Sequence, residues 1–191
     1  MESNQKMRIV SGNLKGKKIF YIKSISTRPL RDQVKESIFN IIDHSKLTEV
    51  KIRESEVLDL YSGIGSFGLE CLSRGSKKIY FIEKNNFSYH ILEKNIKFTN
   101  MENKSICFNL DVATFLKRNK KKFDIIFLDP PFKSFDYLDA IRMIKKYLMY
   151  KEKNLVIIHR ETKIKEIFPD CLKILKISKY GRSKIIFGSI I

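Results

Sequence analysis

Short apolar runs and longer amphipathic stretches alternate along most of the chain. Five runs rich in β-branched and aromatic residues lie at 56–61, 78–82, 105–110, 123–128 and 154–159. Stretches with a helical spacing of apolar residues separate them, most clearly 86–100 and 135–149. Because alternation of strands with helices is typical of βαβ units, the pattern predicts an α/β fold with a mostly parallel sheet and helices on both faces.

The first 45 residues follow a different pattern. Apolar residues flank a glycine-containing turn within 7–23, which predicts a small basic β-hairpin. In the helix expected after Pro29, one apolar face is formed by Val34, Ile38, Ile41 and Ile42. We therefore expect a hairpin-and-helix extension that binds RNA over residues 1–45, and an α/β domain over 46–191 that begins with a charged connector.

Two further strand-like runs end the chain, at 172–179 and 183–190. The segment Tyr180-Gly181-Arg182 joins them and predicts an antiparallel hairpin. With the five earlier runs, this hairpin brings the expected sheet to seven strands.

Length and composition fit a folded domain that buries its own core. The chain has 191 residues, of which 43% are hydrophobic. The first ten residues lack the apolar stretch of a secretory signal, and no apolar run approaches the roughly 18 residues of a membrane span. We therefore expect a soluble cytoplasmic protein without a membrane partner.

Neither the cysteines nor the histidines show the spacing of a metal site. The cysteines are odd in number and lack C-x-x-C spacing, so we expect buried free thiols at Cys71, Cys107 and Cys171. The histidines stand far apart in the sequence, at His44, His90 and His159. The sequence therefore predicts no structural metal.

The chain is strongly basic. Lys and Arg number 38 against 21 Asp and Glu, for a formal net charge of +17. A coding bias toward lysine does not explain the deficit of acids, so the charge favours a polyanionic partner such as nucleic acid. Basic residues concentrate in 1–28 and in 117–122, although the second cluster, taken alone, is more typical of a solvated turn.

A glycine-rich loop follows the strand at 56–61. Gly63, Gly65 and Gly68 match G-x-G-x-x-G, a spacing also found at dinucleotide sites. A carboxylate from Asp59 at the mouth of this loop would repel a pyrophosphate, whereas S-adenosylmethionine carries a sulfonium, an ammonium and no phosphate. The loop therefore favours S-adenosylmethionine, with a dinucleotide or a ligand-free turn as alternatives.

Two acidic residues at the ends of the next strands extend this hypothesis. Glu83 stands 20 residues beyond Gly63 and can accept both ribose hydroxyls of either cofactor. Asp111 follows the third strand and is placed to meet an adenine amino group.

The run 123–128 leads directly into Asp129-Pro130-Pro131-Phe132. In an open parallel sheet this segment ends beside the glycine-rich loop. The exocyclic amine of a base is a poor nucleophile, because its lone pair is delocalised into the ring. Hydrogen bonds from its N–H groups to the Asp129 carboxylate and the Pro130 carbonyl would favour a pyramidal nitrogen, and Phe132 would stack on the base. A proline-rich turn alone would leave the acid and the aromatic unexplained.

Together the two motifs are far more specific than either alone. The chain resembles, nearly end to end, the bacterial small-subunit rRNA guanine-N2 methyltransferases of the RsmD family. The resemblance rests on 7–12, 15–18, 27–29, 34–40, 59–70, 73–75, 82–84, 111, 115–116 and 129–132. Departures at 30–31 and at 180–183 concern details of the RNA contact.

The resemblance implies a Rossmann-like class I methyltransferase that modifies N2 of one guanine in 16S rRNA, within the small ribosomal subunit or its assembly intermediate. It implies S-adenosylmethionine as cofactor and S-adenosylhomocysteine as product, with no metal, and we expect a monomer. Cofactor contacts are expected from Asp59, Tyr61, Gly63, Gly65, Glu83, Lys84, Asp111, Val112 and Asp129. Catalytic positions are expected at Asp129, Pro130, Pro131 and Phe132. RNA contacts are expected from the 117–122 cluster and from Arg8, Lys15, Lys17, Lys18, Arg28 and Arg31.

Other functions stay open at this point. The Asp-Pro-Pro-Phe motif also serves N6-adenine methyltransferases that act on DNA or RNA. An inactive RNA-binding assembly factor could keep the fold, although retention of all four acids of the two motifs argues against it. A dinucleotide oxidoreductase would leave the Asp129 motif unexplained. No cysteine stands at a site position, so we expect direct transfer to nitrogen without a covalent enzyme intermediate.

Overall fold

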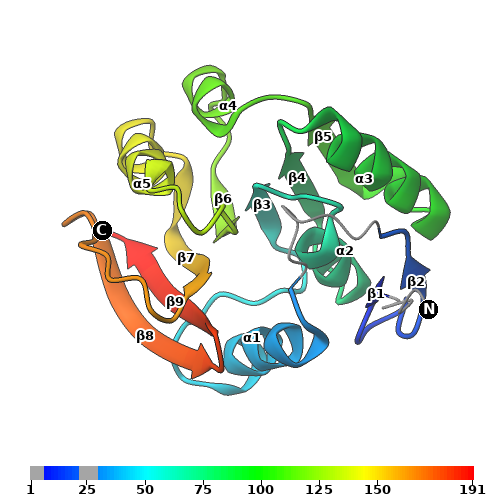
Figure 1. Cartoon of the computed structure of the whole chain (residues 1–191), viewed down its shortest axis with the longest axis horizontal. Helices are drawn as coiled ribbons and strands as arrows, with labels where there is room; N and C mark the ends of the chain where they lie inside the picture. Colours follow the sequence, from blue (N-terminus) through cyan, green and yellow to red (C-terminus); the bar gives the residue numbers. More distant parts are fainter. Residues whose placement is uncertain (1–6, 22–29) are drawn as a thin grey trace.

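The computed structural model describes residues 7–21 and 30–191. Its main body is a seven-stranded sheet in the order β5-β4-β3-β6-β7-β9-β8 (Figure 1). The strands are β3 (Glu56–Leu60), β4 (Lys78–Ile82), β5 (Ser105–Phe108), β6 (Phe123–Leu128), β7 (Tyr150–Glu161), β8 (Leu172–Tyr180) and β9 (Ser183–Ile190). Strands β3 to β7 are parallel, and β9 runs antiparallel between β7 and β8. The mostly parallel sheet and its terminal hairpin, predicted from the sequence, are confirmed.

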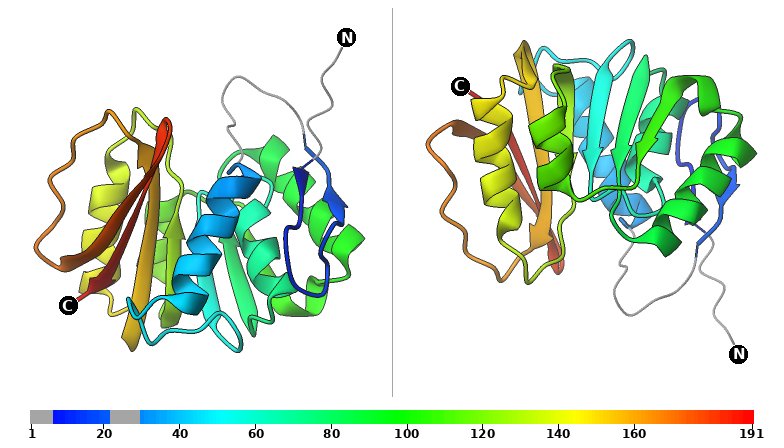
Figure 2. Two further views of the ribbon diagram at one scale, coloured as in Figure 1. Left: turned by 90° about the horizontal axis from the view of Figure 1, so that it is seen from below. Right: turned by 90° about the horizontal axis from the view of Figure 1, so that it is seen from above.

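Helices cover both faces of this sheet. In the described part of the chain they are α1 (Asp32–His44), α2 (Ser66–Ser73), α3 (Asn86–Thr99), α4 (Val112–Arg118) and α5 (Asp136–Lys146), with a 3-10 turn η1 (Glu102–Lys104). Figure 2 shows α1 in front of the sheet in its left view, and α4 and α5 in front of it in its right view. The sheet therefore lies between two helical layers. Because β3 to β7 are parallel, the loops that follow these strands all lie at one edge of the sheet.

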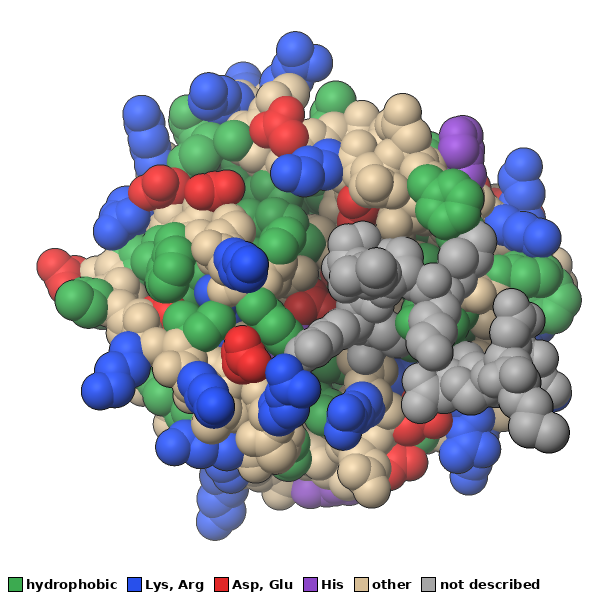
Figure 3. All heavy atoms as spheres, in the orientation of Figure 1, with side chains coloured by type: hydrophobic (Ala, Val, Ile, Leu, Met, Phe, Trp, Pro, Cys, Tyr) green, Lys and Arg blue, Asp and Glu red, His purple; other side chains and the backbone are tan. Residues whose placement is uncertain are grey.

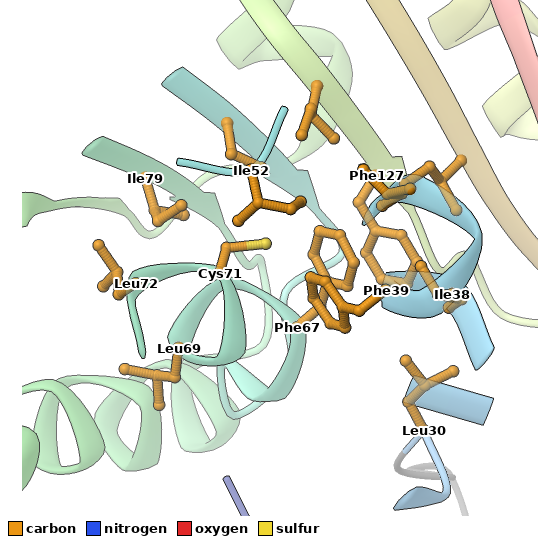
Figure 4. Packing of buried hydrophobic residues seen from close by; sticks show 14 of the residues in the cluster. Leu30, Ile38, Phe39, Ile52, Phe67, Leu69, Cys71, Leu72, Ile79 and Phe127 are labelled. Carbon is orange, nitrogen blue, oxygen red and sulfur yellow. The ribbon is translucent and has the colours of Figure 1, made fainter. Parts of the chain in front are cut away.

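Alternating side chains of the central strands enter two separate cores. On the face covered by α1, α2 and α3, the rings of Phe39 (α1), Phe67 (α2) and Phe127 (β6) stack at centroid distances of 5.4 and 3.9 Å (Figure 4). On the other face, Ile126 and Leu128 of β6 pack in the cluster beneath α4 and α5. Burial on both faces explains why the central strands are continuous apolar runs in the sequence.

A small hairpin precedes α1, as the sequence predicted. It consists of β1 (Met7–Arg8) and β2 (Lys18–Ile19). Buried polar groups fix it to the helices. The Glu70 carboxylate of α2 accepts the N–H groups of Val10 and Ser11, at 2.7 and 2.9 Å, and Asn95 of α3 both accepts from and donates to the backbone of Phe20.

The hairpin turn also fits closely against α2. Gly12 has a φ of +80°, and a Cβ at this position would lie 1.9 Å from the Ser73 carbonyl oxygen, so only glycine fits. From α1, the buried Lys35 ammonium donates to the Arg8 carbonyl at 2.7 Å. Burial lowers the pKa of Lys35, partly offset by Asp32 and Glu70. Ile9 and Ile19 of the hairpin pack in the same cluster as α1 and the sheet.

The basic cluster 117–122 lies at the opposite edge of the sheet from the motif loops. Lys117 and Arg118 are the last residues of α4, and Lys121 forms an ion pair with Glu56 at 2.8 Å. Between this cluster and Asp129, β6 spans six residues, or about 20 Å. The cluster therefore lies about 20 Å from Asp129 along β6, and its contact with RNA stays a prediction.

The cysteines are free, but only Cys71 is fully buried, whereas Cys107 and Cys171 are half-buried. The expectation of three buried thiols is therefore correct only for Cys71. Within the described residues, no group of His, Cys, Asp and Glu is arranged to hold a metal ion. No helix in the described part of the chain is long and apolar enough to cross a membrane.

Candidate active site

A cavity of about 960 Å³ opens at the carboxyl ends of β3, β4 and β6, on the face shown in Figure 3. This volume suits a cofactor or a small ligand. The cavity brings both sequence motifs together, because it is lined by Asp59, Tyr61, Gly63, Glu83, Lys84, Asp111, Val112, Asp129, Pro130, Pro131 and Phe132. Of the predicted cofactor and catalytic residues, only Gly65 is missing from its wall.

The wall of the cavity is acidic although the chain is basic. Among the described residues that line it, two are lysines, Lys84 and Lys133, and six are carboxylates: Asp59, Glu83, Asp111, Asp129, Asp136 and Asp139. In Figure 3, Lys and Arg side chains project around the edge of this face. Such a wall attracts a cationic ligand and repels a phosphate.

Gly65 instead shapes the loop that carries Asp59 toward the cavity. It precedes α2 with a φ of +85°, and a Cβ would lie 2.5 Å from Leu92 Cδ1. This tight turn brings the first turn of α2 over the end of β3. There the Asp59 carboxylate accepts the Gly68 N–H through Oδ2 at 3.1 Å.

Asp59 lies within β3 and is 1% exposed, rather than at the mouth of the loop as we expected from the sequence. Its second oxygen, Oδ1, is buried and has no hydrogen-bond partner in the described structure. Burial raises the pKa of Asp59 well above the usual range, and the negative charges of Asp129 and Glu83 act in the same direction. A buried acceptor without a partner is costly, so this oxygen fits a site for a cationic or hydrogen-bond-donating ligand.

Glu83 follows β4 and Asp111 follows β5, so both lie on the other side of the glycine-rich loop from Asp129, which follows β6. The Glu83 carboxylate accepts the Gly63 N–H at 2.8 Å and the Asn85 N–H at 2.7 Å, which holds it beside the loop. Asp111 caps α4 by accepting the Thr114 N–H at 2.9 Å, and these hydrogen bonds lower its pKa. Both carboxylates keep free lone pairs for a sugar hydroxyl or an amine.

Asp129 is held by a histidine that the sequence analysis did not select. His159, at the end of β7, lies with Nδ1 2.9 Å from Asp129 Oδ1, and its Nε2 is 3.0 Å from the Ser183 hydroxyl. His159 is 4% exposed, and its ring packs against that of Phe132 in a T-shaped arrangement with centroids 5.6 Å apart. An ionised carboxylate only accepts, so Nδ1 carries the proton of this hydrogen bond, and the Ser183 hydroxyl can pair with Nε2 on the other side of the ring.

The next residue of β7 fixes the backbone of the same loop. The fully buried Arg160 donates to the carbonyls of Pro131, Phe132 and Ser134, at 3.1, 2.8 and 3.1 Å. Glu166 neutralises it at 3.1 Å and also pairs with Lys184 at 2.6 Å. The sequence holds one signal for His159 and Arg160. They stand at the end of the predicted strand 154–159, and the carboxyl end of a parallel strand lies at the same sheet edge as the end of the strand 123–128.

Those residues predicted to contact RNA that the structure describes lie outside the cavity wall. Lys15 and Lys18 are exposed on the hairpin, and Arg31 is exposed just before α1. Arg8 forms an ion pair with Asp32 at 3.2 Å, and the Lys17 ammonium lies 4.8 Å from the centre of the Phe98 ring. Arg28 lies outside the described residues.

Known proteins resemble this chain over nearly its whole length. A family described as "Conserved hypothetical protein 95" matches residues 7–189. Ribosomal RNA small subunit methyltransferase D from Haemophilus influenzae is 32% identical over 89% of this chain and 86% of its own length. The protein of that name from Buchnera aphidicola of Acyrthosiphon pisum is 32% identical over 87% of this chain and 84% of its own.

Solved structures agree with the fold. A candidate methylase from Haemophilus influenzae, 29% identical, superposes with a TM-score of 0.76 over 97% of this chain and 99% of its own. A candidate methyltransferase from Escherichia coli, 23% identical, gives 0.81 over 97% and 98% and shows the shared fold. With both motifs at one cavity and a family match from residue 7 to residue 189, the chain belongs to the conserved hypothetical protein 95 family, the RsmD family of methyltransferases.

Proposed function

We propose that this protein transfers a methyl group from S-adenosylmethionine to the exocyclic N2 amine of a guanine in 16S rRNA. The observation that carries the proposal is one cavity whose wall contains both Asp59, with its buried and unpartnered Oδ1, and the Asp129 loop held by His159. Two of the family's members are named as ribosomal RNA small subunit methyltransferases, which supports rRNA as the substrate.

The cavity fits the cofactor by its chemistry. S-adenosylmethionine, when bound, supplies an electrophilic methyl group on a positively charged sulfur. Asp59 Oδ1 and the acidic wall would offset that charge, and Glu83 would accept the ribose hydroxyls. The same wall disfavours the pyrophosphate of a dinucleotide, which removes the oxidoreductase alternative.

The Asp129 loop would prepare the amine for attack. With Oδ1 occupied by His159, Asp129 Oδ2 stays open for one N–H of the target amine. Arg160 takes the carbonyls that follow Pro130 and makes no hydrogen bond to that of Pro130, which can accept the second N–H. Phe132, which packs with His159 in a T-shaped arrangement and lines the cavity, would contact the base.

Acceptors held in place in this way stabilise the positive charge that develops on nitrogen. With S-adenosylmethionine bound, these acceptors would hold the amine for direct transfer of the methyl group from sulfur to nitrogen. The methylated amine would be strongly acidic and would lose its proton to water. The base must stand outside its stack to reach Asp129.

One experiment tests this proposal. Small-subunit particles without the modification are incubated with the protein and methyl-labelled S-adenosylmethionine, and the digested RNA is separated into nucleosides. We expect the label in N2-methylguanosine. Label in N6-methyladenosine would assign the enzyme to the adenine class, and cofactor binding without transfer would indicate an inactive assembly factor. The Asp129→Ala variant should lose transfer while its cofactor affinity stays within about tenfold.

A further inference from the structure

One exposed face of α3 joins the cavity to the N-terminal hairpin. One side of this helix carries Phe87, Ile91, Lys94 and Phe98. The last three stand four, seven and eleven residues after Phe87, and residues at these spacings share one face of a helix. Phe87 and Ile91 line the cavity, whereas Phe98 lies at the far end. From Phe87 to Phe98 the helix rises about 16 Å. We call these four residues, with Lys17 and Phe20 of the hairpin, the α3 stripe.

The far end of the stripe is a cluster of aromatic rings and lysines. Phe20 and Phe98 meet edge to face at 5.2 Å. The Lys94 ammonium lies 3.9 Å from the centre of the Phe20 ring, and Lys17 lies 4.8 Å from that of Phe98. The three phenylalanines stay open to solvent, at 38% for Phe20, 47% for Phe98 and 57% for Phe87. In Figure 3, hydrophobic side chains reach the surface among Lys and Arg over α3.

Attachment of the hairpin does not account for these exposed rings. Asn95 already binds the Phe20 backbone as acceptor and as donor, and Glu70 binds the other strand of the hairpin. Exposed aromatic faces beside cations are instead the pattern of sites for single-stranded nucleic acid, where bases stack and ammonium groups meet phosphates.

We propose that the α3 stripe binds an unpaired RNA segment next to the target nucleotide. This inference rests on the proposed RNA substrate. A base stacks on Phe98 at the hairpin end, and a second base stacks on Phe87 at the rim of the cavity. Lys17 and Lys94 swing from the rings to the phosphates between them. The exchange is favourable, because an exposed cation–π contact is weaker than the stacking of a base on an aromatic ring.

Conservative variants separate stacking from packing and from charge. Phe98→Leu keeps the apolar cover of the hairpin but removes the ring, and Phe98→Tyr keeps the ring. The probe is a short fluorescent oligoribonucleotide without base pairing, titrated at several salt concentrations. We expect Phe98→Leu to bind about fivefold more weakly or worse with an unchanged salt slope, and Phe98→Tyr to bind like the parent protein. Lys94→Gln should lower the slope by about 0.7.

Unchanged affinity in a folded Phe98→Leu protein, or equal loss in the Tyr and Leu variants, would overturn the proposal. So would preference of the parent protein for a perfect duplex over the single strand. Thermal unfolding shows whether each variant is folded, and unaltered cofactor affinity shows that the cavity is intact. Because binding is measured without methyl transfer, this test gives its answer even where the labelling of small-subunit particles fails.

Discussion

At the residue scale, Asp129 owes its position to two side chains from other strands. Its Oδ1 receives the His159 Nδ1–H, and the Ser183 hydroxyl contacts Nε2 on the far side of the ring. The carboxylate is thereby aimed before substrate arrives. An acceptor that needs no reorganisation during the reaction lowers the barrier more than a freely rotating one.

The first prediction separates this hydrogen bond from the bulk of the imidazole. In His159→Asn the amide nitrogen can stand close to where Nδ1 stands and can still donate, whereas His159→Leu leaves Asp129 Oδ1 without its donor. We expect kcat to fall about tenfold to a hundredfold in the Leu variant and clearly less in the Asn variant. The Kd for S-adenosylmethionine should stay unchanged in both, which isothermal titration measures. Equal loss of kcat in the two variants would show that only packing matters.

The second prediction concerns the buried Asp59, whose pKa is raised by burial. A raised pKa means that the folded state holds this proton more tightly than the unfolded chain does. The resulting penalty on folding therefore begins above the ordinary Asp pKa and grows until the raised value is passed. Asp59→Asn removes the penalty, so the apoprotein should gain stability, by about 1 kcal/mol or more at alkaline pH and by less under acidic conditions.

The same substitution should weaken cofactor binding. The protonated Asp59 cannot offset a positive charge, so the affinity of the parent protein for S-adenosylmethionine should fall as the pH decreases through the raised pKa. In Asp59→Asn the affinity should be low and flat across that range. Denaturant titrations and cofactor binding, each measured over pH, check the two halves. A variant that is less stable at every pH would contradict the account of an unpartnered carboxyl.

At the scale of elements, the active-site loop is braced by the end of β7. Arg160 joins three carbonyls of the loop to Glu166, and both side chains of this ion pair are at most 1% exposed. Removing one partner of a buried pair leaves an uncompensated charge.

The third prediction uses Glu166→Gln, which keeps the shape but removes the charge shared by Arg160 and Lys184. We expect the free energy of unfolding to drop by about 3 kcal/mol and kcat to fall with it, because the loop loses its anchor. Glu161→Gln is the matched control. It breaks the outer ion pair with Arg182, at 3.5 Å, and should change stability by less than about 1 kcal/mol. Similar losses in the two variants would show that the brace contributes little.

The parallel strands were predictable because burial on both faces makes them continuous apolar runs, and β4 and β6 were predicted residue for residue. The seven-residue α4 was not, since it is too short for its apolar spacing to stand out and its last turn lies in the basic cluster. The glycine-rich loop and the Asp129 motif were predictable because their chemistry is local in sequence. His159 and Arg160 were not, because their role depends on β7 pairing with β6.

At the scale of the whole molecule, charge is segregated. In a chain with a net charge of +17, the described part of the cavity wall carries six carboxylates and two lysines, while Lys15 and Lys18 are exposed on the hairpin. The separation lets a cationic cofactor enter and keeps RNA phosphates on the outer surface. Polyanion binding and cofactor binding should therefore respond independently to substitution.

The last prediction tests this independence with two matched triple variants. Replacing Lys15, Lys17 and Lys18 by Gln should reduce the salt slope of RNA binding by about two to three, because each lost phosphate contact contributes about 0.7 to 0.9. The same substitution at Lys117, Lys120 and Lys122 removes equal charge at the opposite edge of the sheet and should leave the slope nearly unchanged. Cofactor affinity should be unaltered in both proteins.

Thermal unfolding must first show that the hairpin variant is folded, because lysine stems also cover apolar surface. If both triple variants lower the slope equally, binding depends on net charge alone and the hairpin has no special role. If only the 117–122 variant lowers it, the RNA follows the other edge of the sheet, and the path along α3 to the cavity must be abandoned. A loss confined to the hairpin variant supports a path for the RNA backbone over the hairpin, from which α3 leads to the cavity that holds Asp129.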